Sequence, residues 1–488
     1  MGTQVIAFLK LAIWGIHWLA VVFIFVYCTY LFILAIIKIS RQNIKPKSFE
    51  FGELPWVTIQ LPLYNERWVA DELFACIDQI QYSRLQIQIL DDSTDQTLDI
   101  SKKWYEKWRE KGRDVELLHR TERVGFKAGA LLHGLKRARG EMIAIFDADF
   151  RPAPDFLIRM MPFFHSSQIA AVQARWGYSN PDQNMLTRLQ KLQLNVHFQI
   201  EQQAKFIQQL LIQFNGTCGI WRKSAIEQAG NWQSDTLTED LDLSYRAQLA
   251  GYQLVYNVEL EVKGELPQEI SGLKLQQHRW MKGGAETAKK LLPKLWYSKL
   301  SPIAKLTASI HLLSSSVYIA VLTMVFTTFC ITLFLPQEQL INVPAVISYL
   351  PFVFFVVSMI IANPPATNNT TSKLKHWVTF IIYLPVFMAF SLGLSYHNAK
   401  AAVAGWLGIR TPFIRTPKTG SHSNNNYIQG QFHPIRLVPE LLMAIICTIC
   451  ILVKGKENPF FVFHLLGAIG YLSIFILTFY SQYSKNED

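Results

Sequence analysis

Long uncharged stretches near both ends of the chain are the first feature of its hydrophobic pattern. Residues 11–37 contain no Asp, Glu, Lys or Arg, which is enough for one tilted membrane helix. This stretch is too long for a signal peptide, and no small-residue cleavage site follows it. Further apolar runs occupy 306–335, 341–362, 376–399, 437–453 and 459–480. The pattern predicts membrane-spanning helices on either side of a more polar middle.

Basic residues beside these runs indicate which segments face the cytosol. The ten residues after the first run carry four basic side chains and no acid, so this flank should be cytosolic. Residues 282–305 contain six lysines and one acid, Glu286, interleaved with Leu and Trp296. This composition favours an amphipathic helix on the cytosolic membrane surface over an ordinary solvated helix.

The run at 376–399 allows two topologies. Its 24 uncharged positions are enough to cross a bilayer, which would give six spans. However, residues 398–436 after it carry five basic side chains and no acid, and two preceding spans already return the chain to the cytosol. We therefore expect 376–405 to form an interfacial or re-entrant helix, leaving five spans.

The middle of the chain, residues 48–300, alternates between strand and helix patterns. Continuous apolar strands separated by helices imply a mostly parallel sheet, which binds ligands at the carboxyl ends of its strands. No glycine-rich phosphate-binding fingerprint follows the first strand, which argues against a dinucleotide enzyme or a P-loop ATPase. The expected strands are 56–61, 86–90, 115–119, 142–147 and 170–175, and the expected helices are 69–80, 96–111, 125–139 and 155–164.

Carboxylates follow several of these strands. Asp91-Asp92 and Asp147-Ala148-Asp149 end two of them, and Thr238-Glu239-Asp240 lies further along the same domain. One such pair would be an ordinary turn or helix cap, but spare carboxylates at the end of an apolar strand are costly unless they bind something. A divalent cation that holds a nucleotide diphosphate fits this need. Three basic residues are candidates to help the diphosphate leave: Lys127, His278 and Arg279.

Composition narrows the class of protein further. Of the 488 residues, 50% are hydrophobic and only 17% are charged, which excludes a disordered chain and argues against a purely soluble one. The net charge of +11 could suggest nucleic-acid binding, but basic residues beside apolar runs are typical of membrane proteins. The six cysteines are scattered and form no readable metal or disulfide framework.

The motifs resemble those of a known family. Asp91-Asp92, Asp147-Ala148-Asp149, Thr238-Glu239-Asp240 and Gln276-Gln277-His278-Arg279-Trp280 occur in this order, and together they resemble the D, DxD, TED, QxxRW signature of processive family 2 glycosyltransferases. Longer strings such as QILDDSTDQT, AIFDADFRPAPDF and TEDLDLSYRAQLAGY resemble cellulose-synthase-like proteins of the plant mannan and xyloglucan-backbone type. The resemblance is dense from residue 55 to about 300 and looser over the membrane segments and 413–418.

The resemblance implies an α/β fold in which a GT-A type nucleotide-sugar-binding domain is inserted between transmembrane α-helices. The expected organisation has six parts. These are an N-terminal membrane helix with a basic cytosolic flank (1–47), a cytosolic glycosyltransferase domain (48–281), an interfacial amphipathic helix (282–305), two membrane helices (306–362), an interfacial helix with a cytosolic gating-like loop (363–436), and two membrane helices with a short tail (437–488).

The resemblance also implies a role for individual residues at the donor. Asp147 and Asp149 would hold the diphosphate through Mg²⁺ or Mn²⁺, and Arg279 would lie beside the leaving diphosphate. The expected donor-binding residues are Tyr64, Glu66, Asp92, Lys127, Asp147, Gln276 and Arg279.

At the acceptor, Asp240 would be the general base that deprotonates the attacking hydroxyl. Trp280 would stack on the acceptor sugar, and Asn215, Gly216 and Thr217 would shape its site. Thr416 and Lys418 resemble the gating loop of cellulose synthases, although here Pro417 stands between them.

The implied function is a multi-pass membrane synthase, processive, inverting and metal-dependent. It would extend a β-linked glycan, a β-1,4 mannan or glucan, from a nucleotide sugar and pass the chain outward. The donor is UDP-glucose or GDP-mannose, the partners are the growing glycan and the bilayer, and no nucleic acid is expected. The membrane would be the cell inner or plasma membrane, or the Golgi membrane in a eukaryote, and the catalytic domain would be cytosolic. The sequence does not indicate the oligomeric state. The alternatives are a ceramide-glucosyltransferase-like enzyme that glycosylates a lipid and, less favoured, a transporter with a regulatory soluble domain.

Overall fold

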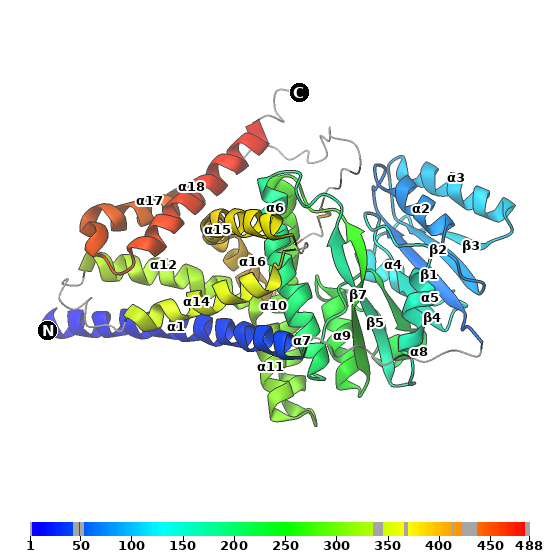
Figure 1. The fold of residues 1–488 in the computed structure, drawn as a ribbon, viewed down its shortest axis with the longest axis horizontal. Coiled ribbons are helices and arrows are strands. Elements are labelled where there is room, and N and C mark those ends of the chain that lie inside the picture. The colour runs from blue at the N-terminus through cyan, green and yellow to red at the C-terminus, as the bar shows by residue number, and fades with distance from the viewer. Residues whose placement is uncertain are drawn as a thin grey trace.

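The chain folds into an α/β body at one end and a bundle of apolar helices at the other (Figure 1). A computed structural model describes residues 2–41, 48, 53–334, 345–365, 369–411, 414–416, 418, 420 and 437–483. Within these residues, the long helix α1 (Gly2–Ser40) lies in the bundle, and the chain then enters the α/β body before it returns to the bundle.

The α/β body is built on a seven-stranded sheet with the order β3-β2-β1-β4-β6-β5-β7. β1 pairs in parallel with β2 and β4, whereas β6 runs antiparallel to both of its neighbours, β4 and β5. The expected alternation of strands and helices is confirmed, and β6 and β7 add two strands that the apolar pattern did not indicate. The strands are β1 (Val57–Leu63), β2 (Leu85–Asp91), β3 (Asp114–His119), β4 (Met142–Ile145), β5 (Ile169–Tyr178), β6 (Gly219–Arg222) and β7 (Gln253–Gly264).

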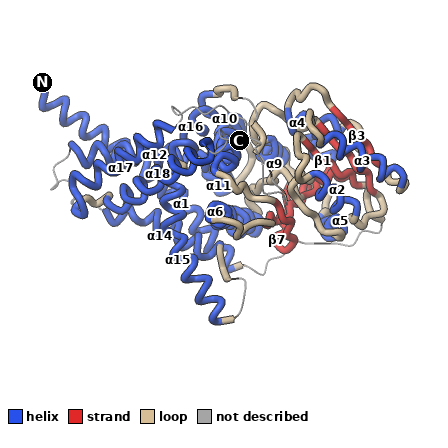
Figure 2. Tube along the Cα trace, turned by 90° about the horizontal axis from the view of Figure 1, so that it is seen from above, coloured by secondary structure: helices blue, strands red, loops and turns tan. Residues whose placement is uncertain are grey.

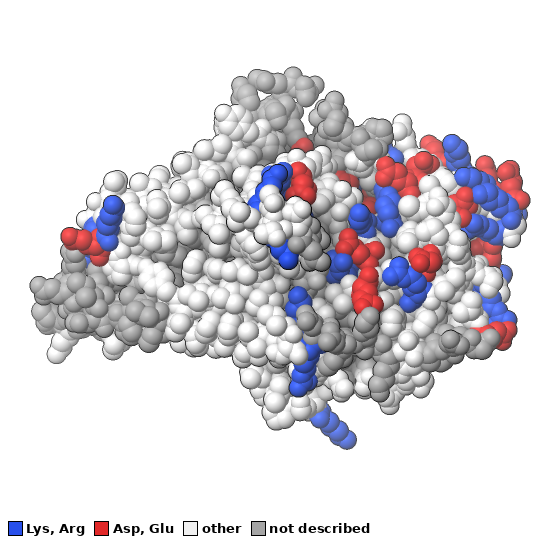
Figure 3. Space-filling view, viewed as in Figure 1, with Lys and Arg blue, Asp and Glu red and all other residues white. Residues whose placement is uncertain are grey.

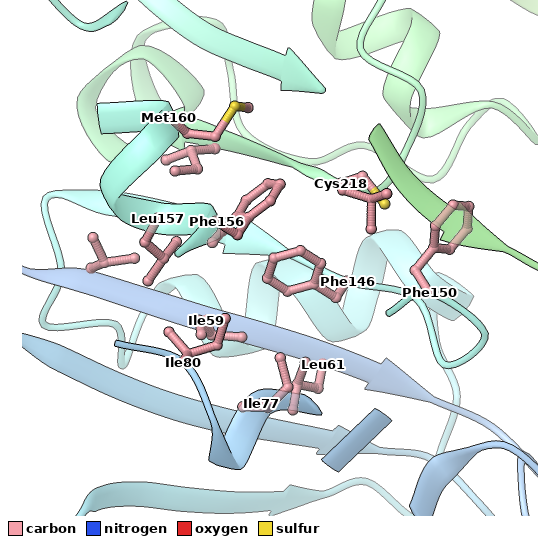
Figure 4. Packing of buried hydrophobic residues seen from close by; sticks show 14 of the residues in the cluster. Ile59, Leu61, Ile77, Ile80, Phe146, Phe150, Phe156, Leu157, Met160 and Cys218 are labelled. Atoms are coloured by element: carbon pink, nitrogen blue, oxygen red, sulfur yellow. The ribbon is translucent and has the colours of Figure 1, made fainter. Parts of the chain in front are cut away.

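Helices cover both faces of the sheet. On one face α2 (Ala70–Asp78), α3 (Thr97–Glu110) and α5 (Phe156–Met160) bury aromatic side chains against the strands. Figure 4 shows this packing, in which the rings of Phe146 and Phe156 meet edge to face at 5.0 Å. The other face is covered by α4 (Phe126–Leu135), α8 (Lys223–Gln228) and α9 (Glu239–Leu249). Two filled cores fix the strands and therefore the loops at their carboxyl ends.

The remaining helices connect the sheet to the bundle and form the bundle itself. They are α6 (Met185–Asn195), the π-helix η2 (Val196–Glu201), α7 (Gln202–Ile207), α10 (Ile270–Tyr297), α11 (Pro302–Leu312), α12 (Val317–Phe334), α14 (Ala345–Ala362), α15 (Thr370–Gly393), α16 (Ser395–Leu407), α17 (Val438–Lys454) and α18 (Phe461–Tyr483). Short 3₁₀ turns lie at Met161–Phe163, Ser314–Ser316 and Gly455–Glu457.

Helix α10 crosses the domain boundary that we expected between residues 281 and 282. It is continuous from Ile270 to Tyr297, so the Gln276–Trp280 motif and the lysine-rich stretch share one helix. Lys282 is buried and its ammonium donates to Thr411 Oγ1 at 2.6 Å, so this lysine belongs to a packed interface and not to a membrane surface. The apolar face of the helix packs on α9 and α11. Membrane contact by the exposed Trp296 and Tyr297 remains a prediction.

Five of the described helices are long and apolar enough to cross a membrane. They are Phe8–Ser40, Ser314–Phe334, Thr370–Gly393, Val438–Glu457 and Phe461–Ser481, and a shorter apolar helix covers Tyr349–Ala362. This set includes α15, which we expected at the membrane interface. However, α15 is seen nearly end-on in Figure 1, where α1, α12 and α14 run along the long axis, and it projects from the bundle in Figure 2.

Candidate active site

A cavity of about 640 Å³ joins the carboxyl ends of the strands to the interior of the helical bundle. Its lining includes most of the site residues expected from the sequence: Lys127, Asp147, Asp149, Asn215, Gly216, Asp240, Gln276, Arg279, Trp280, Thr416 and Lys418. Four expected residues are not among those that line it: Tyr64, Glu66, Asp92 and Thr217.

Asp147 and Asp149 follow β4, where the strand leaves the core. Lys127 Nζ donates to Asp147 Oδ1 at 2.6 Å, and the ammonium of Lys418 donates to Asp149 Oδ1. Burial alone would raise the pKa of Asp149, but Lys418 and the backbone N–H of Glu265 hold it below its usual value. Asp149 is therefore kept as an anion. Both side chains offer carboxylate oxygens, the kind of ligand that Mg²⁺ and Mn²⁺ prefer.

Asp240 lies in the first turn of α9, directly after Glu239. Burial and the neighbouring charge of Glu239 raise the pKa of Asp240 to about 7, although Lys127 acts in the opposite direction. Gly216 adopts the left-handed φ of +78°, and a Cβ placed there would lie 3.0 Å from Asp240 Oδ2. The Gly216 backbone can therefore approach Asp240 closely. The raised pKa of Asp240 makes its carboxylate suited to proton transfer near neutral pH.

Three residues of the α10 motif face the cavity together. Gln276, Arg279 and Trp280 are spaced at i, i+3 and i+4, which places them on one side of the helix. Arg279 Nη2 donates to Thr416 Oγ1 at 2.9 Å, and burial lowers the pKa of this guanidinium. His278 is not among the residues that line the cavity, and its ring lies 6.1 Å from that of His397 on α16.

Tyr64 and Asp92, two of the expected donor-binding residues, lie outside the cavity lining and contact arginines that the sequence analysis did not single out. Arg120 Nε donates to Asp92 Oδ1 at 2.8 Å. The guanidinium of Arg123 lies 3.2 Å above the ring centre of Tyr64. Arg120 directly follows β3 and Arg123 lies three residues later, so the end of this strand could have indicated both.

Glu66 and the expected gating residues are joined through a segment far along the chain. Arg415 Nε donates to Glu66 Oε1 at 2.8 Å, and Lys418 Nζ lies 3.9 Å from the same oxygen. Thr416 and Lys418 both line the cavity, whereas Pro417 lies outside the described residues. Arg415 and Lys418 therefore connect this segment to Glu66 and Asp149.

The expected acceptor residues Asn215, Gly216 and Thr217 divide into two groups. Asn215 and Gly216 line the cavity, but Thr217 is fully buried. The hydroxyl of Thr217 accepts the backbone N–H of Asp147 at 2.9 Å. Thr217 therefore supports the strand end that carries the carboxylates and does not face the cavity.

The far part of the cavity is apolar. It is lined by Ile24 and Leu31 of α1, Val321 of α12, Phe352 of α14 and Phe387 of α15. Figure 3 shows charged side chains gathered over the α/β domain and sparse on the visible surface of the bundle. A polar site at the sheet thus opens into a set of helices whose surface suits a membrane.

Comparisons with known proteins identify the family of this chain. Residues 58–229 match the family model for glycosyl transferase family 2. The chain is 34% identical over 438 residues to glucomannan 4-beta-mannosyltransferase 2 of Arabidopsis thaliana, covering 84% of this chain and 78% of that one. It is 31% identical to glucomannan 4-beta-mannosyltransferase 1 of Cyamopsis tetragonoloba, covering 88% and 83% of the two chains.

A solved structure has the same fold. Mannosyltransferase PcManGT from Pyrobaculum calidifontis, in complex with GDP-Man and Mn²⁺, aligns with a TM-score of 0.52 at 17% identity, over 83% of this chain and 100% of that one. This likeness confirms the GT-A type fold expected from the sequence. The sequence matches confirm the resemblance itself: the chain belongs to the family 2 glycosyltransferases, within the cellulose-synthase-like group of glucomannan 4-beta-mannosyltransferases.

Proposed function

We propose that this protein is a membrane synthase that transfers mannosyl units from GDP-mannose to a growing β-1,4-linked glycan and passes the product through its helical bundle. The observation that carries the proposal is the single cavity that runs from Asp240 and Arg279 into the apolar helices. GDP-mannose is favoured over UDP-glucose because the matching relatives are named mannosyltransferases. A lipid-glycosylating enzyme or a transporter has no comparable support among them.

The proposed reaction is a direct displacement with inversion. The acceptor hydroxyl oxygen attacks the anomeric carbon of the donor while Asp240 takes its proton, and the bond from that carbon to the diphosphate oxygen breaks. Arg279 stabilises the charge that develops on the leaving GDP, as a guanidinium is suited to do. Because attack and departure occur on opposite sides, one step gives the β-linkage from an α-linked donor.

The DxD carboxylates suit a divalent cation. Asp147 and Asp149 would hold Mg²⁺ or Mn²⁺, which when bound neutralises the diphosphate. In the described structure Lys127 and Lys418 pair with these two carboxylates. Two neighbouring carboxylates that are each paired with a cation are what we expect at a site that holds a metal ion and a diphosphate.

The proposed topology places the α/β domain in the cytosol, where nucleotide sugars are available. The helical bundle would lie in the plasma membrane or a Golgi membrane. Two observations support it: the basic flank after α1, and the contact of Arg415, Thr416 and Lys418 with the catalytic residues. That contact requires the chain after α16 to lie on the catalytic side. An interfacial α15 satisfies this requirement with five spans.

The test is incorporation of labelled sugar by membranes that contain the protein. GDP-mannose and UDP-glucose are supplied separately, and the product is digested with a β-1,4-mannanase or a β-1,4-glucanase. We expect GDP-mannose to give mannanase-sensitive polymer, and Asp240→Asn membranes to give none above background. A labelled product that extracts entirely into organic solvent would show a lipid acceptor and contradict the proposal.

Secretion needs a separate measurement. Sealed vesicles with the catalytic domain outward should accumulate polymer that mannanase cannot digest until detergent is added. Polymer that is fully digestible in intact vesicles would refute passage through the bundle.

A further inference from the structure

The π-helix η2 places two ionisable residues on the cavity wall beside the acceptor site. His197 and Glu201 both line the cavity, and the polar sequence around them had been interpreted only as an amphipathic helix. A π-helical turn is rare and is often found at functional sites. The π-helix therefore makes His197 and Glu201 candidates for a role at the cavity.

His197 links Glu201 to Asn215. Its Nδ1 lies 2.9 Å from Glu201 Oε2, and its Nε2 lies 2.9 Å from Asn215 Nδ2. An amide nitrogen only donates, so Nε2 accepts and the ring is neutral with its proton on Nδ1, which donates to the carboxylate. Gln202 Nε2 donates to Asn215 Oδ1 at 2.8 Å, which fixes the same orientation of the amide from its other end.

Glu201 is itself held as an anion. Burial alone would raise its pKa, but Lys205, His311 and His197 hold the pKa well below its usual range. Lys205 Nζ lies 3.4 Å from Glu201 Oε1, and the hydroxyl of Tyr30 donates to the same oxygen at 3.1 Å. A fixed buried carboxylate sets the tautomer and the angle of the imidazole that it contacts.

We infer that Glu201 and His197 are positioning residues for the acceptor, acting through Asn215. Asn215 Nδ2 carries two hydrogens, of which one is used by His197. Within the part of the chain that the structure describes, no hydrogen bond uses the other, which is a donor on a side chain that lines the cavity. Its chemistry suits a hydroxyl oxygen of the glycan, one residue from the Gly216 backbone that abuts Asp240. This inference rests on the proposed function.

A metal site is the other use that this cluster suggests. Ligand atoms of His197, Glu201 and His311 lie within 4.8 Å of one another. However, the fully buried ammonium of Lys205 already balances the charge of Glu201, and a divalent cation would have to lie close to it. His311 Nδ1 is also 2.6 Å from the hydroxyl of Tyr245. The cluster is therefore complete as a network of hydrogen bonds and one ion pair, in which Lys205 balances the charge of Glu201.

The experiment separates acceptor from donor effects in the full-length protein. His197→Phe keeps a ring but removes both nitrogens, so we expect the KM for short β-1,4-mannan oligosaccharides to rise roughly tenfold, the equivalent of one hydrogen bond. The Kd for GDP-mannose should stay unchanged. His197→Gln, whose amide oxygen can accept from Asn215, should restore most of the acceptor affinity.

Two further variants complete the design. Glu201→Gln keeps the size of the side chain and should also raise the acceptor KM. Tyr245→Phe removes a hydrogen bond from the far side of the same cluster and should leave the acceptor KM unchanged. Equal losses of acceptor and donor affinity in His197→Phe, or no loss at all, would overturn the inference. Failure of the wild type to extend any oligosaccharide from GDP-mannose would instead overturn the proposed function.

Discussion

The carboxylate of Glu239 should control the pH at which this enzyme works. Asp240 must be ionised to accept a proton, and its pKa of about 7 results from burial and the charge of Glu239. The rate should therefore rise with pH through a midpoint near 7 in the wild type. Glu239→Gln removes the neighbouring charge, so the pKa of Asp240 should fall and the midpoint should move to lower pH.

The size of the shift follows from simple electrostatics. At an effective dielectric constant of about 20, two like charges within about 12 Å of each other interact by roughly 1.4 kcal/mol or more, and 1.4 kcal/mol corresponds to about one pKa unit. Glu239 and Asp240 are adjacent in the chain, so their carboxylates lie within this range. With a midpoint near 7, about a tenth of Asp240 is ionised at pH 6. After a shift of about one unit, about half is ionised, so the variant should be roughly fivefold faster than the wild type relative to its own plateau.

The assay is the initial rate of sugar transfer from saturating donor between pH 5 and 9. Glu227→Gln, on the exposed surface of α8, makes the same change of net charge and should leave the midpoint in place. Asp240→Asn should lower the rate by at least ~10²-fold at every pH, as expected for a lost general base. An unchanged midpoint in Glu239→Gln, or a pH-dependent rate in Asp240→Asn with the wild-type midpoint, would refute the assignment of Asp240 as the base.

Three further predictions concern the metal, the close approach at the base and the membrane topology. Asp149→Ala should weaken GDP-mannose binding at least ~10-fold by calorimetry, and EDTA should stop wild-type turnover until Mn²⁺ or Mg²⁺ is added; full activity in excess chelator would contradict this. Gly216→Ala should reduce the free energy of unfolding by about 1–2 kcal/mol, the strain of a left-handed residue, and this should be measured as a lower melting temperature. The variant should also have a lower kcat, because the new methyl would lie 3.0 Å from Asp240 Oδ2. Single cysteines at Thr370 and Ile409, at either end of α15 and α16, should react with an impermeant thiol reagent from the same side of sealed vesicles, whereas labelling from opposite sides would show that α15 crosses the bilayer.

The sequence by itself determined the α/β class of the middle domain, and it predicted which residues form the candidate site. Apolar strands have a strong local pattern, and a carboxylate that directly follows such a strand must lie at one edge of the sheet. Asp147 and Asp149 could therefore be placed at that edge without any coordinates, whereas Asp240 lies in the first turn of α9 and was placed with them only by the family resemblance. The family resemblance supplied the roles of these residues, which local pattern alone does not encode.

Local pattern did not indicate β6 or the full extent of α10. β6 has four residues, too few to show a period, and it forms because β4 and β5 offer it antiparallel edges on both sides. α10 continues through residue 282 because Lys282 is buried against Thr411 and α16, a partner that lies far away in sequence. Composition alone made that lysine resemble part of a membrane-surface helix.

Only the tertiary structure decided which partner each charged group meets. Lys418 reaches Asp149 across 269 positions, and Arg415 reaches Glu66 across 349. Thr217 turns away from the cavity to hold the Asp147 backbone, and His197 meets Asn215 because a π-helical turn aims it there. Such contacts depend on how elements that are distant in sequence pack together. That packing is fixed by the hydrophobic cores on the two faces of the sheet, which the local sequence pattern does not encode.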